Sequence, residues 1–358
     1  MRVASVSFWH LHGTDYARDA QNNPDVDLVA LWDDDHERGR AGAAKHGIPF
    51  VEDLDQILDD ASIEGVIVCS PTSEHVPLVT RCIQAGKHVF MEKVLSADLA
   101  GAEEIVAAAR EADITLAVSL WRSDRGYTGQ IAEMVRNGTV GTVTSARVRD
   151  GHPFALPTAD NPDGILPARF YDRRTAQGGV LIDLCHPLYV LARIMGLPDT
   201  VMAGFGHVTA RETEDNAAVL MVYPTGAIGI AETSAVSRVT PFTIEIHGTA
   251  GSILYSEPGI GAFVAARTHG GGGGDSPDDV PRLRYRNTDD ELQEWHELEI
   301  APDTPLAFNQ WVDHVAQGTR AESNLELALE LSSLVEAAYE SAADSRRVTV
   351  QPTTRAAV

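Results

Sequence analysis

Along the first third of the chain, short apolar runs alternate with longer amphipathic segments. Runs rich in β-branched residues predict buried strands at 3–7, 26–32, 65–69, 88–91 and 115–119. The segments between them predict helices at 35–46, 53–59, 73–85 and 97–112. Strands that alternate with helices of this length indicate βαβ units and a parallel sheet. Because such crossovers are right-handed, we expect a doubly wound α/β sheet.

After residue 122 the pattern changes. A predicted helix at 125–137 leads into a β-branched run at 142–150, a loop with four prolines follows, and a second helix is predicted at 179–195. Runs of β character then succeed one another without intervening helices, which indicates an open, mainly antiparallel sheet. These runs lie at 201–208, 217–223, 227–234, 243–247, 252–255, 262–266 and 295–300. Two helices at 305–317 and 324–341 and a strand at 347–350 complete the prediction, and Gly270–Gly274 predicts a flexible loop.

A chain of 358 residues is long enough for two domains. The change of pattern divides it into a dinucleotide-type α/β domain at 1–121 and an α+β domain at 122–358, with C-terminal helices that can pack back on the first domain.

Composition narrows the class of partner. Lys and Arg number 28 against 52 Asp and Glu, so the formal net charge is −24, which disfavours binding to nucleic acid and to anionic membranes. The three cysteines form no CxxC motif, which argues against a disulfide framework or a structural zinc site. The amino-terminal residues lack the apolar stretch of a signal peptide, and no apolar run approaches a membrane span. We therefore expect a cytoplasmic protein.

The run GKHVFMEK at 86–93 is the strongest candidate for chemistry. It reads as a helix-ending glycine, a short buried strand, and then Glu92 and Lys93 at the carboxyl end of that strand. Ligands of open α/β sheets bind beyond the carboxyl ends of the strands. Lys93 can therefore bind a substrate hydroxyl or take part in proton transfer. The alternative is a structural lysine that pairs with Glu92.

Asp33 follows the second predicted strand, about 20 residues past the first βα turn, where an acid can bind both ribose hydroxyls of an adenosine. An acid there repels a 2′-phosphate and favours NAD over NADP. Asp34 is the alternate, and a helix N-cap is the other explanation. The first turn lacks the usual glycines and reads Ser7-Phe8-Trp9-His10, so phosphate would be bound through Ser7, His10 or water.

Two further segments have competing explanations. His10 and His12 are spaced like metal ligands, but no carboxylate or cysteine lies close in sequence, so we expect no metal. The run SPTSEH at 70–75 follows the third predicted strand of the first domain. Its helix N-terminus can offer N–H groups to a phosphate or ribose, or serve as a cap alone.

The run GGVLIDLCH at 178–186 is the second chemical motif. Asp183 and His186 are three residues apart, so on the predicted helix they share a face. An acid beside an imidazole can fix its tautomer and raise its pKa, and such a histidine can accept a hydroxyl proton. A structural ion pair explains the same spacing.

Together these segments resemble, in order and over nearly the whole chain, the glucose-fructose oxidoreductase, inositol dehydrogenase and rhizopine-catabolism (Gfo/Idh/MocA) family. Residues 86–93 resemble its GKHVxxEKP segment, 68–75 its AxPxxxH segment, 178–186 its GGGxxxDxGxH segment and 138–143 its GxIGxV turn, while residues near 337–348 match its closing helix and strand. The resemblance implies a dinucleotide-binding Rossmann domain at 1–121 followed by a sheet domain that often joins subunits, hence a homodimer or homotetramer. It also implies sugar or cyclitol substrates.

The resemblance also implies roles for single residues. Lys93 would bind and polarise the reacting oxygen, Asp183 would bind substrate and assist, and His186 would be the general acid or base. Expected cofactor contacts come from Ser7, Phe8, Trp9, His10, Asp33, Asp34, Ser70, Pro71, Thr72, His75, Glu92, Lys93 and Arg122. Expected substrate contacts come from Lys93, Arg122, Arg169, Tyr171, Asp183 and His186, with selection in the loop 152–172.

The chain departs from the family pattern at four places. The phosphate loop lacks its glycines, Val94 stands where the family usually has proline, Gln177 replaces the first glycine of the triple, and Asp183 and His186 are three rather than four residues apart.

The sequence therefore predicts an NAD-dependent oxidoreductase that acts on a CH–OH group of a sugar, cyclitol or glycoside. The alternatives are an NAD-dependent glycoside hydrolase of the same fold and a non-catalytic sensor of a sugar or cofactor.

Overall fold

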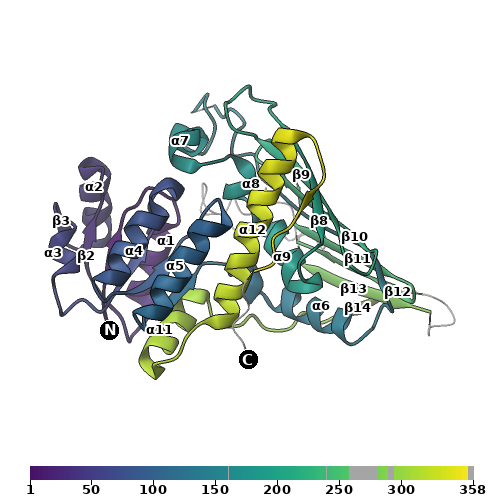
Figure 1. Ribbon diagram of the computed structural model, residues 1–358, viewed down its shortest axis with the longest axis horizontal. Coiled ribbons are helices and arrows are strands. Elements are labelled where there is room, and N and C mark those ends of the chain that lie inside the picture. Colours follow the sequence, from purple (N-terminus) through teal and green to yellow (C-terminus); the bar gives the residue numbers. More distant parts are fainter. Residues whose placement is uncertain (160, 239, 258–279, 289–293, 354–358) are drawn as a thin grey trace. The chain divides into compact units, whose positions relative to one another are not determined.

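The computed structural model describes residues 1–159, 161–238, 240–257, 280–288 and 294–353 (Figure 1). Among them the chain forms two compact units. The first unit comprises Met1–Trp121 and Pro305–Ser332, and the second comprises Arg122–Thr304 and Ser333–Pro352.

The first unit is built on a six-stranded sheet in the order β3-β2-β1-β4-β5-β6, with every pair parallel. Its strands are β1 (Arg2–Val6), β2 (Asp27–Trp32), β3 (Phe50–Val51), β4 (Gly65–Val68), β5 (His88–Met91) and β6 (Leu116–Val118). The chain order reverses beside β1, which makes the carboxyl ends of β1 and β4 the ligand-binding position of such a sheet. The predicted doubly wound parallel sheet is confirmed.

Helices connect these strands. They are α1 (Gly13–Asn22), α2 (His36–His46), α3 (Asp55–Leu58), α4 (His75–Gln84) and α5 (Leu99–Glu111), joined by α11 (Ala307–Gln317) and the first part of α12 (Glu322–Asp344). The starts of α2 and α5 follow from local sequence, since the Asp35 and Asp98 side chains accept backbone N–H groups there. Figure 1 shows α4 and α5 side by side.

Aromatic packing fixes α11 within the first unit. The Phe90 ring of β5 meets Tyr16 and Phe308 edge to face, with centroids 5.1 and 5.3 Å apart. The buried Trp311 indole N–H donates to the Thr115 carbonyl at 3.2 Å. A helix about 200 residues downstream of β5 is therefore part of the core under the first sheet.

The second unit contains a nine-stranded sheet in the order β14-β13-β12-β11-β7-β10-β9-β8-β15. Among the described strands β10 and β7 pair in parallel and the others pair antiparallel, as the mainly antiparallel prediction requires. The strands are β7 (Val143–Gly151), β8 (Thr200–Gly206), β9 (Asn216–Val222), β10 (Ile228–Ser234), β11 (Thr243–Gly248), β12 (Gly251–Ser256), β13 (Arg282–Asn287), β14 (His296–Leu298) and β15 (Val348–Thr349). The strand β13 was not predicted, and the predicted strand at 262–266 and the loop Gly270–Gly274 lie outside the described residues.

The helices of the second unit include α6 (Gly126–Arg136), α7 (Arg173–Ala176), α8 (Val180–Asp183), α9 (His186–Met195) and the second part of α12. The nearly fully buried α9 packs against α6 and against β7 and β10 (Figure 1). No helix in the described part of the chain is both long and apolar enough to cross a membrane.

The single helix predicted at 179–195 is wrong, because the chain leaves helical geometry at Leu184 between α8 and α9. Pro187 is the physical reason. Proline lacks an N–H and clashes with the carbonyl four residues earlier, so it is tolerated in the first turn of a helix but not in the interior. Pro187 occupies that first turn of α9. Asp183 and His186 therefore belong to different helices.

Candidate active site

Glu92 and Lys93 lie directly after β5, at the carboxyl edge of the parallel sheet. The Glu92 N–H donates to the Val68 carbonyl at 2.9 Å, which continues the β4–β5 pairing by one residue. The Lys93 ammonium lies 3.3 Å from Glu92 Oε1, and the two side chains are only 3% and 1% exposed. Such a buried pair differs from a surface salt bridge, because neither charge is shielded by water.

His75 ties the turn after β4 to the segment after β5. Its Nδ1 lies 2.7 Å from the Val94 carbonyl and its Nε2 lies 3.3 Å from the Ser70 carbonyl. Burial lowers the pKa of His75 despite these carbonyls, so the ring is neutral and the shorter contact assigns its proton to Nδ1. The Lys93–Val94 peptide is cis.

The Ser70 hydroxyl is buried beside this histidine and finds no hydrogen-bond partner among the described residues. Pro71 and Thr72 are buried as well, in the turn that begins α4. The carboxyl end of β4 thus offers a buried hydroxyl with unused hydrogen-bonding capacity.

Glu92 also faces the first βα turn. Its Oε2 lies 3.1 Å from His12 Nδ1 and accepts the Tyr16 hydroxyl, while its Oε1 lies 4.0 Å from His10 Nε2. Burial by itself raises the pKa of Glu92, but His10, His12 and Lys93 outweigh it and hold that pKa well below its usual range. The carboxylate is therefore ionised, and it is the acid that the sequence did not reveal near His10 and His12.

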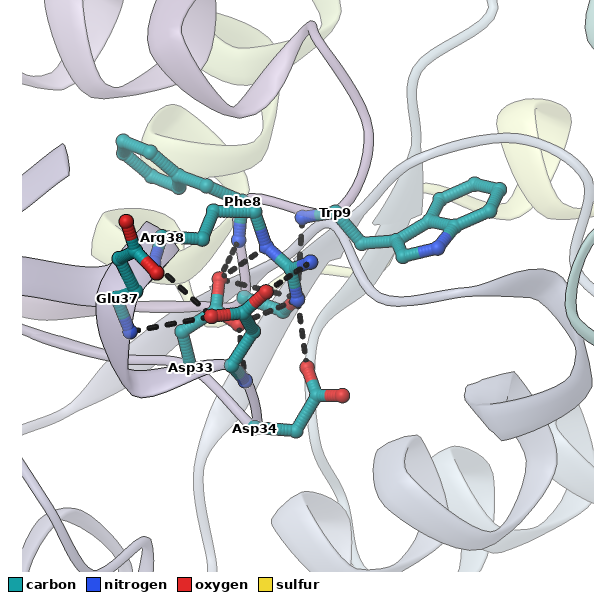
Figure 2. Close-up of polar contacts among 8 residues, drawn as sticks. Phe8, Trp9, Asp33, Asp34, Glu37 and Arg38 are labelled. Carbon is teal, nitrogen blue, oxygen red and sulfur yellow. Dashed lines mark hydrogen bonds and ion pairs between the residues drawn. The ribbon is translucent and has the colours of Figure 1, made fainter. Parts of the chain in front are cut away.

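Asp33 is fully buried at the end of β2 and is surrounded by donors (Figure 2). It accepts the Phe8 N–H at 2.6 Å, the Asp35 N–H at 2.9 Å and the Arg38 Nε at 3.0 Å. Asp34 is 60% exposed and lies 2.8 Å from the same guanidinium. The predicted ribose contact at Asp33 stays a prediction, and it requires the Arg38 guanidinium to yield at least one carboxylate oxygen.

In the first βα turn the backbone N–H groups donate to acceptors within the protein, whereas in a glycine-rich loop such groups are available to bind phosphate. Ser7 adopts a left-handed conformation with φ of 67°, a geometry that glycine usually supplies. The Trp9 N–H donates to Ser7 Oγ at 3.1 Å, and the His10 N–H donates to the Cys69 carbonyl at 3.0 Å. In Figure 2 the Trp9 indole points away from Asp33.

In the second unit, Arg122 is the centre of a buried charge cluster. Its Nε lies 3.4 Å from Asp150 Oδ2, its NH1 donates to the Tyr127 hydroxyl at 2.8 Å, and its guanidinium stacks 3.6 Å above the Phe242 ring. Asp150 Oδ1 lies 3.2 Å from His152 Nε2. Burial raises the pKa of Asp150, but Arg122 and His152 reverse this and hold the pKa far below its ordinary value.

The remaining predicted substrate residues also belong to the second unit. His186 begins α9, is buried, and has its Nδ1 2.9 Å from the Tyr189 hydroxyl. Burial, with the charge of Asp183 adding to it, raises the pKa of Tyr171 to about 12. Arg211 stacks on the Tyr171 ring at 4.1 Å, and Arg169 lies 5.4 Å from the centroid of Phe170.

Asp150 was not predicted, although the sequence carries a signal for it. Along β7 the buried positions alternate as Ala146, Val148 and Asp150, so an acid takes an inward position of a strand. Arg38 was also missed, and its signal is the i+4 spacing from Asp34.

The predicted site residues thus fall into two sets. In the first unit, Ser7, Phe8 and Trp9 of the turn after β1 lie with Asp33 and Asp34 at the end of β2. His10 of the same turn lies 4.0 Å from Glu92, which follows β5 together with Lys93. Ser70, Pro71, Thr72 and His75 follow β4. The second unit contains Arg122, Arg169, Tyr171, Asp183 and His186. Within it, the charges of Arg122 and His186 both lower the pKa of Asp150.

Known proteins are similar to this chain in sequence and in fold. Residues 8–120 match the model of an oxidoreductase family with an NAD-binding Rossmann fold, and residues 128–254 match the GFO/IDH/MocA C-terminal domain. The chain is 29% identical to a myo-inositol 2-dehydrogenase of Thermotoga maritima, over 71% of this chain and 75% of that enzyme. It is also 29% identical to a dTDP-3,4-didehydro-2,6-dideoxy-alpha-D-glucose 3-reductase of Streptomyces antibioticus, over 69% of this chain and 71% of that one.

Among solved structures, GenD2 from gentamicin A biosynthesis in complex with NAD superposes with a TM-score of 0.77 at 27% identity, and the match covers 98% of this chain and 96% of GenD2. The two matched domains, in this order and over most of the chain, show that it belongs to the Gfo/Idh/MocA family of oxidoreductases with an NAD-binding Rossmann fold.

Proposed function

We propose that this oxidoreductase transfers hydride between nicotinamide and a CH–OH carbon of a sugar, cyclitol or glycoside. The observation that carries the proposal is the buried Lys93–Glu92 pair at the carboxyl edge of a Rossmann sheet. An amine held there, with a separation of 3.3 Å from its carboxylate, can donate to a substrate oxygen. Inositol and deoxysugar enzymes among the relatives support this substrate class.

In this proposal Lys93 binds the reacting oxygen, and Glu92 keeps the amine oriented. His186 receives or returns the hydroxyl proton, and the Tyr189 hydroxyl beside its Nδ1 fixes the ring. Asp183 binds a second substrate hydroxyl. Arg122, Arg169 and Tyr171 complete the substrate contacts, and Arg122 is held by Asp150. The nicotinamide, when bound, supplies the redox chemistry.

The residues of the first unit fit a dinucleotide at the carboxyl ends of the strands. The buried Ser70 hydroxyl has unused hydrogen-bonding capacity, and the helix that follows it begins at the same turn. The turn after β1 fits less well, because the Phe8, Trp9 and His10 N–H groups are already bonded within the protein. We therefore assign phosphate binding in this chain to side chains and to the turn after β4.

We also propose a preference for NAD over NADP. The carboxylates of Asp33, Asp34 and Asp35 all lie within 4 Å of one guanidinium, that of Arg38. The local charge is therefore negative, and a 2′-phosphate placed there would meet more carboxylates than cations.

We assign a different function to each of the two units. We propose that the first unit holds the cofactor, and that the second unit binds substrate and joins subunits into a homodimer or homotetramer through its open sheet. A cytoplasmic location fits a chain that depends on a nicotinamide pool.

The test uses purified protein, NAD⁺ or NADP⁺, and a panel of sugars, cyclitols and glycosides. Formation of reduced nicotinamide is followed by absorbance. We expect turnover with NAD⁺, and we expect Lys93→Ala to lower kcat by ~10²–10³-fold because the donor that binds and polarises the reacting oxygen is lost. Lys45→Ala is the matched control, since that lysine is exposed in the last turn of α2.

Two other outcomes would redirect the assignment. Release of sugar from a glycoside without net formation of reduced nicotinamide would identify a glycoside hydrolase. Ligand binding without turnover, unchanged in Lys93→Ala, would identify a sensor, which the internally bonded turn after β1 makes worth testing.

A further inference from the structure

His10, His12 and Glu92 form a compact cluster inside the first unit. One ligand-type atom from each of these side chains lies within 4.8 Å of the other two. The imidazole ring centroids are 4.4 Å apart, and the carboxylate reaches both rings. All three residues come from the first unit, two from the turn after β1 and one from the end of β5.

We propose that His10, His12 and Glu92 form a binding site for a divalent transition metal ion such as Zn²⁺. Two imidazoles and one carboxylate are a ligand set that zinc uses when a fourth position is left to water or substrate. Imidazole nitrogens also favour late first-row ions over Mg²⁺ and Ca²⁺, which prefer oxygen. This site goes beyond the proposed hydride transfer, and its test needs neither nicotinamide nor substrate.

The distances suit an ion after a small contraction. Ligand atoms bound tetrahedrally at about 2.0–2.1 Å from zinc lie roughly 3.3 Å from one another. The His12 Nδ1 to Glu92 Oε2 separation is already 3.1 Å, and the His10 Nε2 to Glu92 Oε1 separation is 4.0 Å. A movement of His10 by less than one bond length brings its Nε2 to that distance from Glu92, and no two of the three ligand atoms are more than 4.8 Å apart at the outset.

The carboxylate has the support that metal ligands need. The Tyr16 hydroxyl donates to Glu92 Oε2, and the Lys93 ammonium lies 3.3 Å from Oε1. Such partners fix the orientation of a ligating side chain. Glu92 is almost fully buried, whereas the His12 side chain is 33% exposed, so the cluster has an open side through which an ion and its water can enter.

Metal binding through Nε2 requires His10 to change its tautomer. Its Nδ1 accepts the His12 N–H at 3.2 Å, so the neutral ring carries its proton on Nε2, toward Glu92. Coordination through Nε2 moves that proton to Nδ1 and opens the contact with the His12 N–H. Coordination through His12 Nδ1 requires that nitrogen to be free of a proton, so a proton held there moves to Nε2 of the neutral ring, or leaves to solvent if the ring is an imidazolium. Metal uptake thus rearranges the turn after β1, and any imidazolium present releases one proton.

The experiment is a titration of chelator-treated, cofactor-free protein with Co²⁺, followed by its visible absorption, and then competition by Zn²⁺ and Mg²⁺. We expect one Co²⁺ per chain, with bands typical of a low-coordinate nitrogen and oxygen site, displacement by Zn²⁺ and no displacement by Mg²⁺. His12→Ala is the main variant because its partly exposed ring can be removed without emptying the core, and it should weaken Co²⁺ binding by ~100-fold or more. His10→Ala is the second variant and should behave alike.

His207→Ala is the matched control, because that histidine is exposed in the second unit and contacts the Arg211 carbonyl. It should bind Co²⁺ like the wild type. Absence of 1:1 binding in the wild type overturns the proposal, and so does binding of equal strength in folded His10→Ala and His12→Ala. Circular dichroism of each variant establishes that it is folded. Loss of turnover in the hydride-transfer assay would leave these results unchanged, so the two proposals fail separately.

Discussion

Arg122 and Asp150 form a buried ion pair in the second unit, with Nε 3.4 Å from Oδ2. Asp150 is fully buried, and the Arg122 side chain is nearly so. Neither Asp150 oxygen accepts a hydrogen bond among the described residues, so the attraction of Arg122 and His152 offsets the cost of removing the carboxylate from water. The acid acts as the anchor for a guanidinium that we assign to substrate binding.

Replacing the acid should therefore be costly. Asp150→Asn removes one of the carboxylates that hold the buried Arg122 charge and leaves the contact with Glu257, and we expect a loss of about 3 kcal/mol in the free energy of unfolding. Urea unfolding at pH 7 measures it. Glu212→Gln, at an exposed position, is the matched control and should change stability little. Equal stability of Asp150→Asn and the control would contradict the anchoring role.

The same pair predicts a pH dependence. The folded pKa of Asp150 is depressed below that of the unfolded chain, so its stabilisation is present above the unfolded pKa of about 3.9 and is lost as the pH falls toward the folded pKa. The difference in unfolding free energy between wild type and Asp150→Asn should be constant from about pH 8 to 5 and should shrink below about pH 4. A difference that grows on acidification would be the wrong sign.

Asp33 and Asp34 offer a comparison between adjacent acids. Asp33→Ala removes the acceptor of the Phe8 N–H and of Arg38, and leaving such buried donors unpaired costs about 2–3 kcal/mol. Asp34 is 60% exposed, so Asp34→Ala should cost less than about 1 kcal/mol. Thermal or urea unfolding of both variants gives the comparison. Equal destabilisation by Asp34→Ala and Asp33→Ala would show that the hydrogen bonds of Asp33 do not specifically stabilise the turn after β1.

The sequence was sufficient for the parallel sheet and for the placement of Lys93, because β5 and its flanking residues form one local run with a clear apolar period. It failed at Pro187, where the apolar pattern of 179–195 continues through a residue that must begin a helix. It could not reveal the Glu92 contact with His12, since 80 residues separate them and only the parallel order of β1, β4 and β5 brings them together. Asp150 could have been predicted, because it is an acid at a position of β7 whose side chain points into the core.

His75 provides a test of how the segment after Lys93 is held. His75→Gln retains a donor for the Val94 carbonyl but removes a titrating group. Burial depresses the folded pKa of His75, so the unfolded chain binds the proton more readily and the wild type loses stability as the pH falls below about 6.5. We expect that part of the loss between about pH 6.5 and 5 to be absent in His75→Gln. Unfolding free energies at several pH values measure it, and parallel curves for the two proteins would refute the assignment.

Gly179, just before α8, should tolerate no side chain. A Cβ at this position would lie 2.2 Å from the Glu214 carbonyl oxygen. The Gly179 N–H also donates to Glu214 Oε1 at 3.0 Å. Because the obstructing atom is backbone, relief requires the chain to move, and we expect Gly179→Ala to cost about 3 kcal/mol of unfolding free energy. Gly204→Ala in β8 is the matched control, since nothing lies within 4 Å of a Cβ there, and it should stay within about 0.5 kcal/mol of the wild type. Denaturant unfolding of the two variants decides the question, and similar stabilities would mean that the close approach of Gly179 to Glu214 does not constrain the start of α8.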